Sequence, residues 1–295
     1  MTGTAHRSSV EAMTSLPHDP DASDHLRRDF AAERVEAAWF FDWLSAAPGP
    51  AASVLGTSAI RLRGGGIATS MANDPVAYWS KSLGFGSPVD RATIAEIVDF
   101  YVAAGTPSAT IQIAPVLLPA DWPEICAEFA LAHGSSWVKL EGEVDAAARE
   151  ASGLRVAAVG SDDLDEWAHA VFRGFGMPPE HLASIAAESA RRGTIQAFGA
   201  WHGDSIVAGA SLAVVDGVGA LLGASTLPEY RGRGAQSALI AIRARAARAA
   251  GVTRLIAETG RPSVEGANPS LNNLVRAGLA PVYDRVNWEW TNPSW

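Results

Sequence analysis

The chain has 295 residues, of which 48% are hydrophobic and 19% are charged, a composition typical of soluble globular proteins of about two domains. Its net charge of −9 argues against nucleic-acid binding, and its single cysteine excludes an intrachain disulfide framework. No apolar run reaches the roughly 20 residues that cross a bilayer. Residues 1–23 are polar and lack the apolar core of a signal peptide. We therefore expect a cytoplasmic protein that begins with a mobile tail and does not bind membranes.

Residues 24–145 contain one set of alternating helix and strand patterns. Asp24 is expected to cap a first helix over residues 25–47. The elements expected after it are strand material over 60–71 that three glycines interrupt, helix 91–104, strand 109–115, helix 121–134 and strand 136–142. Apolar periodicity is absent from the next segment. We therefore place a domain junction near residues 143–153.

Residues 154–295 restart with a strand and then change character. The predicted elements are strand 154–159, helices within 165–176 and 179–193, strands 195–201, 206–215 and 218–225, helix 235–250, strand 253–258, helix 269–278 and strand 280–290. The dipeptide Asp216-Gly217 between two apolar runs is the strongest short signal of a β-hairpin. The sequence thus predicts an antiparallel meander followed by a parallel pair around helix 235–250.

The segment TLPEYRGRGAQSALI, residues 226–240, places two glycines and two arginines at the start of that helix. The first backbone N–H groups of a helix have no intrahelical partner, and glycine lets a ligand approach the backbone closely. Arginine adds charge and donors that suit phosphate oxygens. The segment therefore predicts an anion site of the kind that holds a pyrophosphate.

Two other nucleotide motifs fit this segment less well. A P-loop requires Gly-Lys-Ser/Thr, which is absent. A dinucleotide fingerprint requires a third glycine, where this chain has Ser237, although Glu258 stands where a ribose-binding acid would end the next strand. Preceding hairpins and a short remaining chain cannot supply a doubly wound sheet, so a dinucleotide-binding protein is the least favoured alternative.

The same segment resembles the acetyl-CoA loop of the GCN5-related N-acetyltransferase (GNAT) family. Leu227-Pro228-Glu229-Tyr230 matches the lead-in, and Arg231 through Gln236 stands at the loop, whose pattern is Arg/Gln-x-x-Gly-x-Gly/Ala. The order of elements over residues 154–295 and the segment from Asn268 to Leu279 are also similar to the family. The resemblance implies a mixed α/β (α+β) fold, a GNAT-like mixed sheet flanked by helices.

The resemblance also implies which residues bind acetyl-CoA as the co-substrate. The backbone of Thr226 and Leu227 would contact the pantetheine arm, and two asparagines would line the cleft. The expected set is Thr226, Leu227, Arg231, Gly232, Arg233, Gly234, Ala235, Gln236, Ser237, Asn268 and Asn273. Helix capping by Asn268 and a surface position for Asn273 stay open as alternatives.

Two positions depart from the family pattern. Gln236 stands where the loop pattern has Gly or Ala, and Leu274 stands where many members carry a tyrosine that protonates the leaving thiolate. A catalytic base is expected to be a carboxylate or an ordered water. Glu258 is the first candidate base, and Tyr283 on the last strand is a candidate replacement acid; an ordinary solvated charge and a half-buried tyrosine are their alternatives.

Residues 24–145 repeat the order of the second half without its arginines, which suggests two tandem GNAT-like domains with a degenerate first one. The expected function is N-acetyl transfer from acetyl-CoA to a primary amine of a small molecule by direct attack. The alternative is a CoA- or acyl-CoA-binding regulatory module without turnover. No metal site is expected, because the seven histidines are scattered. The protein is expected to be a monomer or a homodimer.

Overall fold

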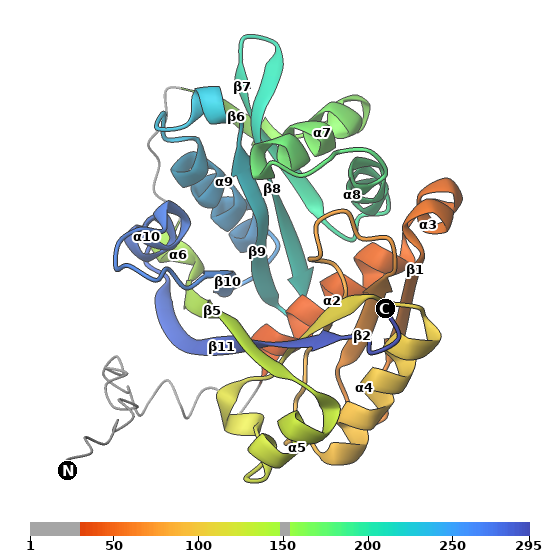
Figure 1. The fold of residues 1–295 in the computed structure, drawn as a ribbon. Coiled ribbons are helices and arrows are strands. Elements are labelled where there is room, and N and C mark those ends of the chain that lie inside the picture. Colours follow the sequence, from red (N-terminus) through yellow and green to blue (C-terminus); the bar gives the residue numbers. More distant parts are fainter. Residues whose placement is uncertain (1–29, 148–153) are drawn as a thin grey trace, which may run out of the picture.

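The structure is a computed structural model that describes residues 30–147 and 154–295. In these residues eleven strands form one mixed sheet, in the order β1-β2-β3-β4-β11-β5-β10-β9-β8-β7-β6 (Figure 1). The strands are β1 Thr57–Arg61, β2 Ile67–Met71, β3 Lys81–Leu83, β4 Ser108–Gln112, β5 Ala132–Glu143, β6 Arg155–Ala158, β7 Gln196–His202, β8 Ser205–Val215, β9 Val218–Thr226, β10 Arg254–Gly260 and β11 Ala280–Thr291.

Helices cover both faces of the sheet, which confirms the expected mixed α/β architecture. They are α2 Ala31–Ser45, α3 Gly49–Leu55, α4 Arg91–Ala103, α5 Trp122–Phe129, α6 Val144–Ala147, α7 Leu164–Phe175, α8 Leu182–Arg191, α9 Ala235–Ala249 and α10 Pro269–Arg276. Helices α2, α7 and α8 share one apolar core on one face. On the other face, α9 and α10 cover the second half and α4 and α5 cover the first. None of the described helices is long and apolar enough to cross a membrane.

The second half contains the predicted meander after β6, α7 and α8. Strands β7, β8 and β9 pair antiparallel in sequence order, and Asp216 and Gly217 both have positive φ at the β8–β9 turn, as a type I′ hairpin requires. Strand β10 then pairs parallel with β9 after α9. In the described residues the only other parallel pair is β3 with β4, so the sheet is not doubly wound and the dinucleotide-binding alternative is wrong.

The last strand of each half crosses to the other half. Strand β5 lies between β10 and β11, and β11 lies between β5 and β4. Figure 1 shows β5 and β11 side by side in the middle of the molecule. The two halves therefore share a continuous hydrogen-bonded sheet. The predicted boundaries of residues 24–145 and 154–295 stay a prediction, since residues 148–153 lie outside the described residues.

Local structure differs from the sequence-based expectation in several places. Residues 57–71 form the β1–β2 hairpin around the three glycines rather than one strand, and α5 ends at Phe129 because Ala130 adopts a left-handed conformation. The short β3 and α3 were not predicted. The 1–23 tail and the expected cap Asp24 lie outside the described residues.

A buried cluster of charged side chains joins α2 to the centre of the sheet. Arg285 on β11 contacts Glu33 and Glu36 of α2 at 2.6 and 2.7 Å and also pairs with Glu258 of β10. Lys139 of β5 lies 2.6 Å from Glu36 and 2.9 Å from Glu258. Glu258 and Lys139 are directly opposite in the β10–β5 register. The cluster thus connects the two halves through side chains as well as through backbone hydrogen bonds.

Burial and charge act against each other in this cluster. Burial alone would raise the pKa of Glu36, but the charges of Arg285 and Lys139 together outweigh it and lower the pKa to about 2. The nearby Lys81 ammonium has no salt-bridge partner among the described residues and lies 3.5 Å from the centroid of the Tyr78 ring. Burial lowers the pKa of Lys81 to about 8. The Glu36 carboxylate is therefore held as an anion by cations from the sheet.

We expect the protein to unfold in a single transition. Because β5 completes the sheet beside β10 and β11 completes it beside β4, neither half keeps its sheet partners when the other unfolds. Urea unfolding followed by far-UV circular dichroism and by tryptophan fluorescence should give coincident curves. Two separated transitions would contradict this expectation.

We also expect Glu36 to contribute an acid-dependent part of stability. Its pKa is about 2 in the folded state, below its ordinary value of 4.5. This contribution is therefore complete above about pH 4.5 and is lost as the pH falls toward 2. Between pH 5 and pH 3 the unfolding free energy should fall by about 2 kcal/mol more in the wild type than in Glu36→Gln. Parallel slopes in denaturant titrations at these pH values would exclude this role.

Candidate functional site

A groove of about 720 Å³ lies at the N-terminal ends of α9 and α10. Most of the residues predicted to bind acetyl-CoA line this groove together. They are Thr226, Arg231, Gly232, Gly234, Ala235, Gln236, Ser237, Asn268 and Asn273. We call this site the loop groove. The segment that the sequence identified as an anion site and the downstream asparagines are thus brought to one place.

The backbone of the loop has the form that the anion-site prediction requires. Gly232 and Gly234 have φ values of 76° and 79°, a left-handed conformation that residues with a Cβ rarely adopt. Gly234 is the N-cap of α9, and no side chain caps this helix end. The first N–H groups of α9 therefore remain available to an anion in the loop groove.

The two loop arginines have different positions. The Arg231 guanidinium donates to the carbonyl oxygen of Gly174 at 2.9 Å and to that of Thr226 at 3.2 Å, so it fastens the loop to the end of α7. Arg233 is exposed, and its guanidinium lies 5.1 Å from the Tyr230 ring centroid. Arg233 does not line the loop groove, in contrast to Arg231.

Leu227 is also outside the groove lining. It is buried, and its backbone N–H donates to the carbonyl oxygen of Val207 at 2.9 Å. Its N–H is therefore already used within the fold. Thr226 lines the groove, as predicted.

Side chains of α9 and α10 are linked across the groove. Gln236 donates to Ser270 Oγ at 2.9 Å and accepts a hydrogen bond from Asn273. Asn268 caps α10 by accepting from the N–H of Ser270 at 2.9 Å. The capping alternative for Asn268 is observed together with its place in the groove lining. Gln236 points toward α10 rather than out to solvent.

A second cavity, of about 460 Å³, adjoins the loop groove. Both are lined by Phe175, Ala224, Gln236 and Ser270. Aromatic rings form much of its wall, and those that line it are Trp39, Phe40, Trp43, Tyr78, Trp79, Trp137, Trp167, Phe172 and Phe175. We call it the aromatic cavity. It lies between α2 of the first half and β9 and β10 of the second, so both halves are needed to enclose it.

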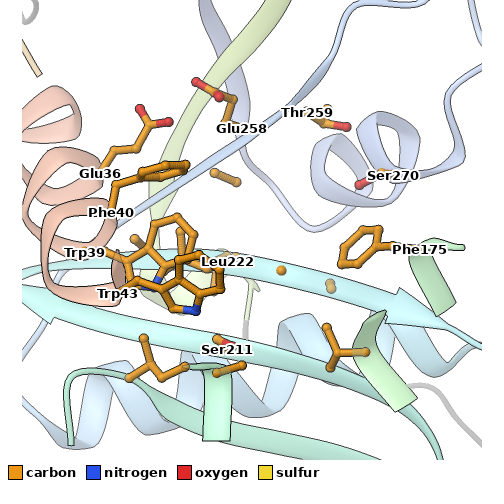
Figure 2. Close-up of a pocket in the computed structure, with 18 of the residues that line it drawn as sticks. Glu36, Trp39, Phe40, Trp43, Phe175, Ser211, Leu222, Glu258, Thr259 and Ser270 are labelled. Atoms are coloured by element: carbon orange, nitrogen blue, oxygen red, sulfur yellow. The ribbon is translucent and has the colours of Figure 1, made fainter. Parts of the chain in front are cut away.

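The two predicted catalytic residues occupy different environments. Glu258 lines the aromatic cavity, and so does Glu36 from the charge cluster (Figure 2). Glu258 Oε2 accepts from Lys139 and Arg285, whereas Oε1 makes no hydrogen bond with the described residues. Tyr283 lines neither cavity. Its hydroxyl donates to Glu33, and burial together with the Glu33 charge raises its pKa.

A buried arginine forms part of the opposite wall of the aromatic cavity. Arg243 of α9 is 1% exposed and donates to the carbonyl oxygens of Leu239, Ser211 and Leu222 at 2.9, 3.0 and 3.1 Å. Ser211 borders an irregularity in the β8–β9 pairing. No ion pair between described residues includes Arg243, and burial lowers its pKa to about 9.

The sequence did not identify the α2 wall of the cavity. Besides apolar residues such as Ala37 and Leu44, α2 buries Glu33, Glu36, Phe40 and Trp43. In a sequence pattern, glutamates indicate a solvent-exposed face. The cations that pair with Glu33 and Glu36 lie far away in the chain, so the local pattern did not reveal that these acids are buried. The available signal was the helical spacing of Glu33, Glu36, Phe40 and Trp43, which places the acids on the same face as the aromatic residues.

The cavity also contains the position where the family tyrosine is replaced. Leu274 of α10 is buried and lines the aromatic cavity beside Ser270. It presents an apolar surface and no hydroxyl.

Among the described residues no group of three or more His, Cys, Asp or Glu side chains is arranged to hold a metal ion.

Comparisons with known proteins agree with this geometry. The sequence model of the acetyltransferase (GNAT) family matches residues 161–269. No curated protein matches the sequence. A GCN5-related N-acetyltransferase from Kribbella flavida is 18% identical, with a TM-score of 0.55 over 84% of this chain and 94% of that one.

Two further solved structures have the same fold over nearly the whole chain. A tandem GNAT protein from the clavulanic acid biosynthesis pathway is 16% identical, with a TM-score of 0.54 over 90% of this chain and 96% of that one. A Drosophila protein is 13% identical, with a TM-score of 0.53 over 95% and 99%. At these identities the structures show the shared fold alone. Residues 161–269 thus match the acetyltransferase (GNAT) family model, and the described residues have the fold of solved GNAT structures.

Proposed function

We propose that the protein transfers an acetyl group from acetyl-CoA to a primary amine of a small molecule that binds in the aromatic cavity. The observation that carries this proposal is that the aromatic cavity adjoins the loop groove, with Phe175, Ala224, Gln236 and Ser270 in the lining of both. A thioester held in the groove would meet an amine held in the cavity at this connection. The aromatic lining suits an organic acceptor rather than water alone.

The loop groove fits the phosphates of acetyl-CoA. The free N–H groups at the start of α9 and the positive end of its dipole attract an anion, and Gly232 leaves open space above the loop. Arg231 adds a positive charge at the groove wall. Thr226, Asn268 and Asn273 supply polar groups along the same groove. In this proposal Arg233 and Leu227 support the loop from outside the groove.

Glu258 is the proposed base. The attacking nitrogen must lose a proton as its bond to the acetyl carbon forms, and the carbon–sulfur bond then breaks to release CoA. Oε1 of Glu258 is the open acceptor on a carboxylate that lines the cavity, so it can receive this proton. The thiolate takes its proton from water in the groove, because Leu274 has none to give. Tyr283 is not assigned a step, since its hydroxyl donates to Glu33.

A CoA-binding regulatory module without turnover is the alternative that Leu274 favours. It shares the loop groove with the enzyme but needs no acceptor. Release of free thiol from acetyl-CoA in the presence of a panel of primary amines distinguishes the two. Tight acetyl-CoA binding without amine-dependent thiol release would favour the regulatory module.

Removal of Arg231 is expected to weaken acetyl-CoA binding. Arg231→Ala removes a groove-wall charge and the bonds that fasten the loop to Gly174. Loss of a hydrogen bond to a charged group corresponds to a dissociation constant raised by about tenfold or more. Isothermal titration calorimetry measures it. Arg192, a surface arginine at the C-cap of α8, lines neither cavity, so Arg192→Ala is the control and should leave the affinity unchanged.

Replacement of Glu258 is expected to slow turnover without changing acetyl-CoA binding. Glu258→Gln keeps the shape of the side chain but cannot accept the amine proton, so kcat should fall by about 100-fold or more. Tyr283→Phe is the matched control and should keep kcat within about threefold of the wild type. Wild-type turnover in Glu258→Gln, measured by thiol release, would remove Glu258 from the mechanism.

A further inference from the structure

The aromatic cavity has charged groups on two separate walls. Figure 2 shows Glu36 and Glu258 on one side, Ser211 on the other, and Trp39, Trp43 and Leu222 between them. The Arg243 guanidinium contacts Ser211 and Leu222, so it belongs to the wall opposite the carboxylates. The Arg243 guanidinium is therefore separated across an apolar space from the two carboxylates and from Lys139, which pairs with them.

Hydrogen bonds within the fold use only part of the Arg243 guanidinium. Its Nε and Nη1 groups satisfy three backbone carbonyl oxygens, which explains why a donor is needed beside the irregular β8–β9 pairing. Its Nη2 group makes no hydrogen bond with the described residues. A buried guanidinium without a carboxylate partner is costly, because desolvation is not offset by an ion pair. Arg243 lines the cavity, so an anion placed there would pair with it.

The opposite wall has the complementary property. Glu258 Oε1 makes no hydrogen bond with the described residues, and Glu36 lies beside it. Two lining tryptophans, Trp39 and Trp79, also have buried indole N–H groups without partners in the described residues. The cavity thus presents an acceptor to an amine on one side and donors to an oxygen-bearing group elsewhere.

We propose that the acceptor is an amino-carboxylate whose amine and carboxylate stand at opposite ends of an aromatic body. The carboxylate pairs with Arg243, the ring lies among the cavity tryptophans, and the amine reaches Glu258. An α-amino acid does not fit this arrangement, because its amine and carboxylate are adjacent and cannot face opposite walls. The inference rests on the proposed amine acetylation at the same cavity.

The test compares three probe amines with acetyl-CoA as donor. They are 4-(aminomethyl)benzoate, its neutral amide 4-(aminomethyl)benzamide, and phenylalanine. Because the first two differ in one charged group, their ratio of kcat/KM isolates the contribution of the carboxylate. A charge-assisted hydrogen bond predicts that the benzoate is favoured by at least about tenfold. Phenylalanine should be the poorest acceptor of the three.

Variants of Arg243 test whether this residue causes the preference for the benzoate over the benzamide. Arg243→Gln should abolish the benzoate-to-benzamide ratio, and Arg243→Lys, which retains a charge, should keep part of it. The ratio is taken within one variant, so damage to the β8–β9 region lowers both rates and leaves the ratio unaffected. Arg248→Gln, on the exposed side of the same helix, is the control and should keep the wild-type ratio.

Binding of the same probes to the CoA-loaded protein, measured by calorimetry, separates this inference from the proposed function. Preferential binding of the benzoate without thiol release would overturn amine acetylation and support the ligand assignment. Acetylation of the benzoate and the benzamide at equal kcat/KM would overturn the ligand assignment and leave acetylation in place. Faster acetylation of phenylalanine, an unchanged ratio in Arg243→Gln, or no binding of any probe would also overturn the ligand assignment.

Discussion

The buried charge cluster under α2 is the interaction on which the rest of the structure depends. Three carboxylates from α2 and β10 are paired with Arg285 of β11 and Lys139 of β5. A buried charge that loses its partner is strongly destabilising, so the helix and the three strands must all be in register for any of them to be stable. That requirement fixes α2 across the join between the two halves. It also places Trp39, Phe40 and Trp43 over the space between β9 and the first half.

The exchange of strands makes this cluster possible. Because β5 lies beside β10, Lys139 stands directly opposite Glu258, and because β11 lies beside β5, Arg285 reaches both Glu258 and the α2 acids. In a half that kept its own last strand, Lys139 and Glu258 would be on different sheets. The cavity is therefore a property of the whole chain, and the first half contributes its wall even though its own loop lacks the arginines of the second.

Local patterns predicted the loop groove well, and long-range pairing explains why they did not predict the aromatic cavity. Asp216-Gly217, the glycines of the loop and the alanine-rich α9 carry their signals within a few residues, so their structure follows from the nearby sequence. The strand exchange has no such signal, since β5 and β11 have ordinary strand patterns whatever their neighbours are. Glu36 was missed for a related reason: its partner Lys139 is 103 residues away in the chain. Glu258 was found because it is the acid at the end of the predicted strand 253–258, although β10 continues to Gly260.

The two departures from the family pattern meet at the boundary between the groove and the cavity. Gln236 is bonded to Ser270 and Asn273, which ties the N-terminal ends of α9 and α10 together, and Leu274 forms the apolar wall next to them. In the proposed reaction the thiolate is released where both helices begin. The positive ends of two helix dipoles and the open N–H groups of α9 then stabilise its negative charge. A hydroxyl at position 274 is not required for this stabilisation, because the leaving group can be protonated by water from the open groove.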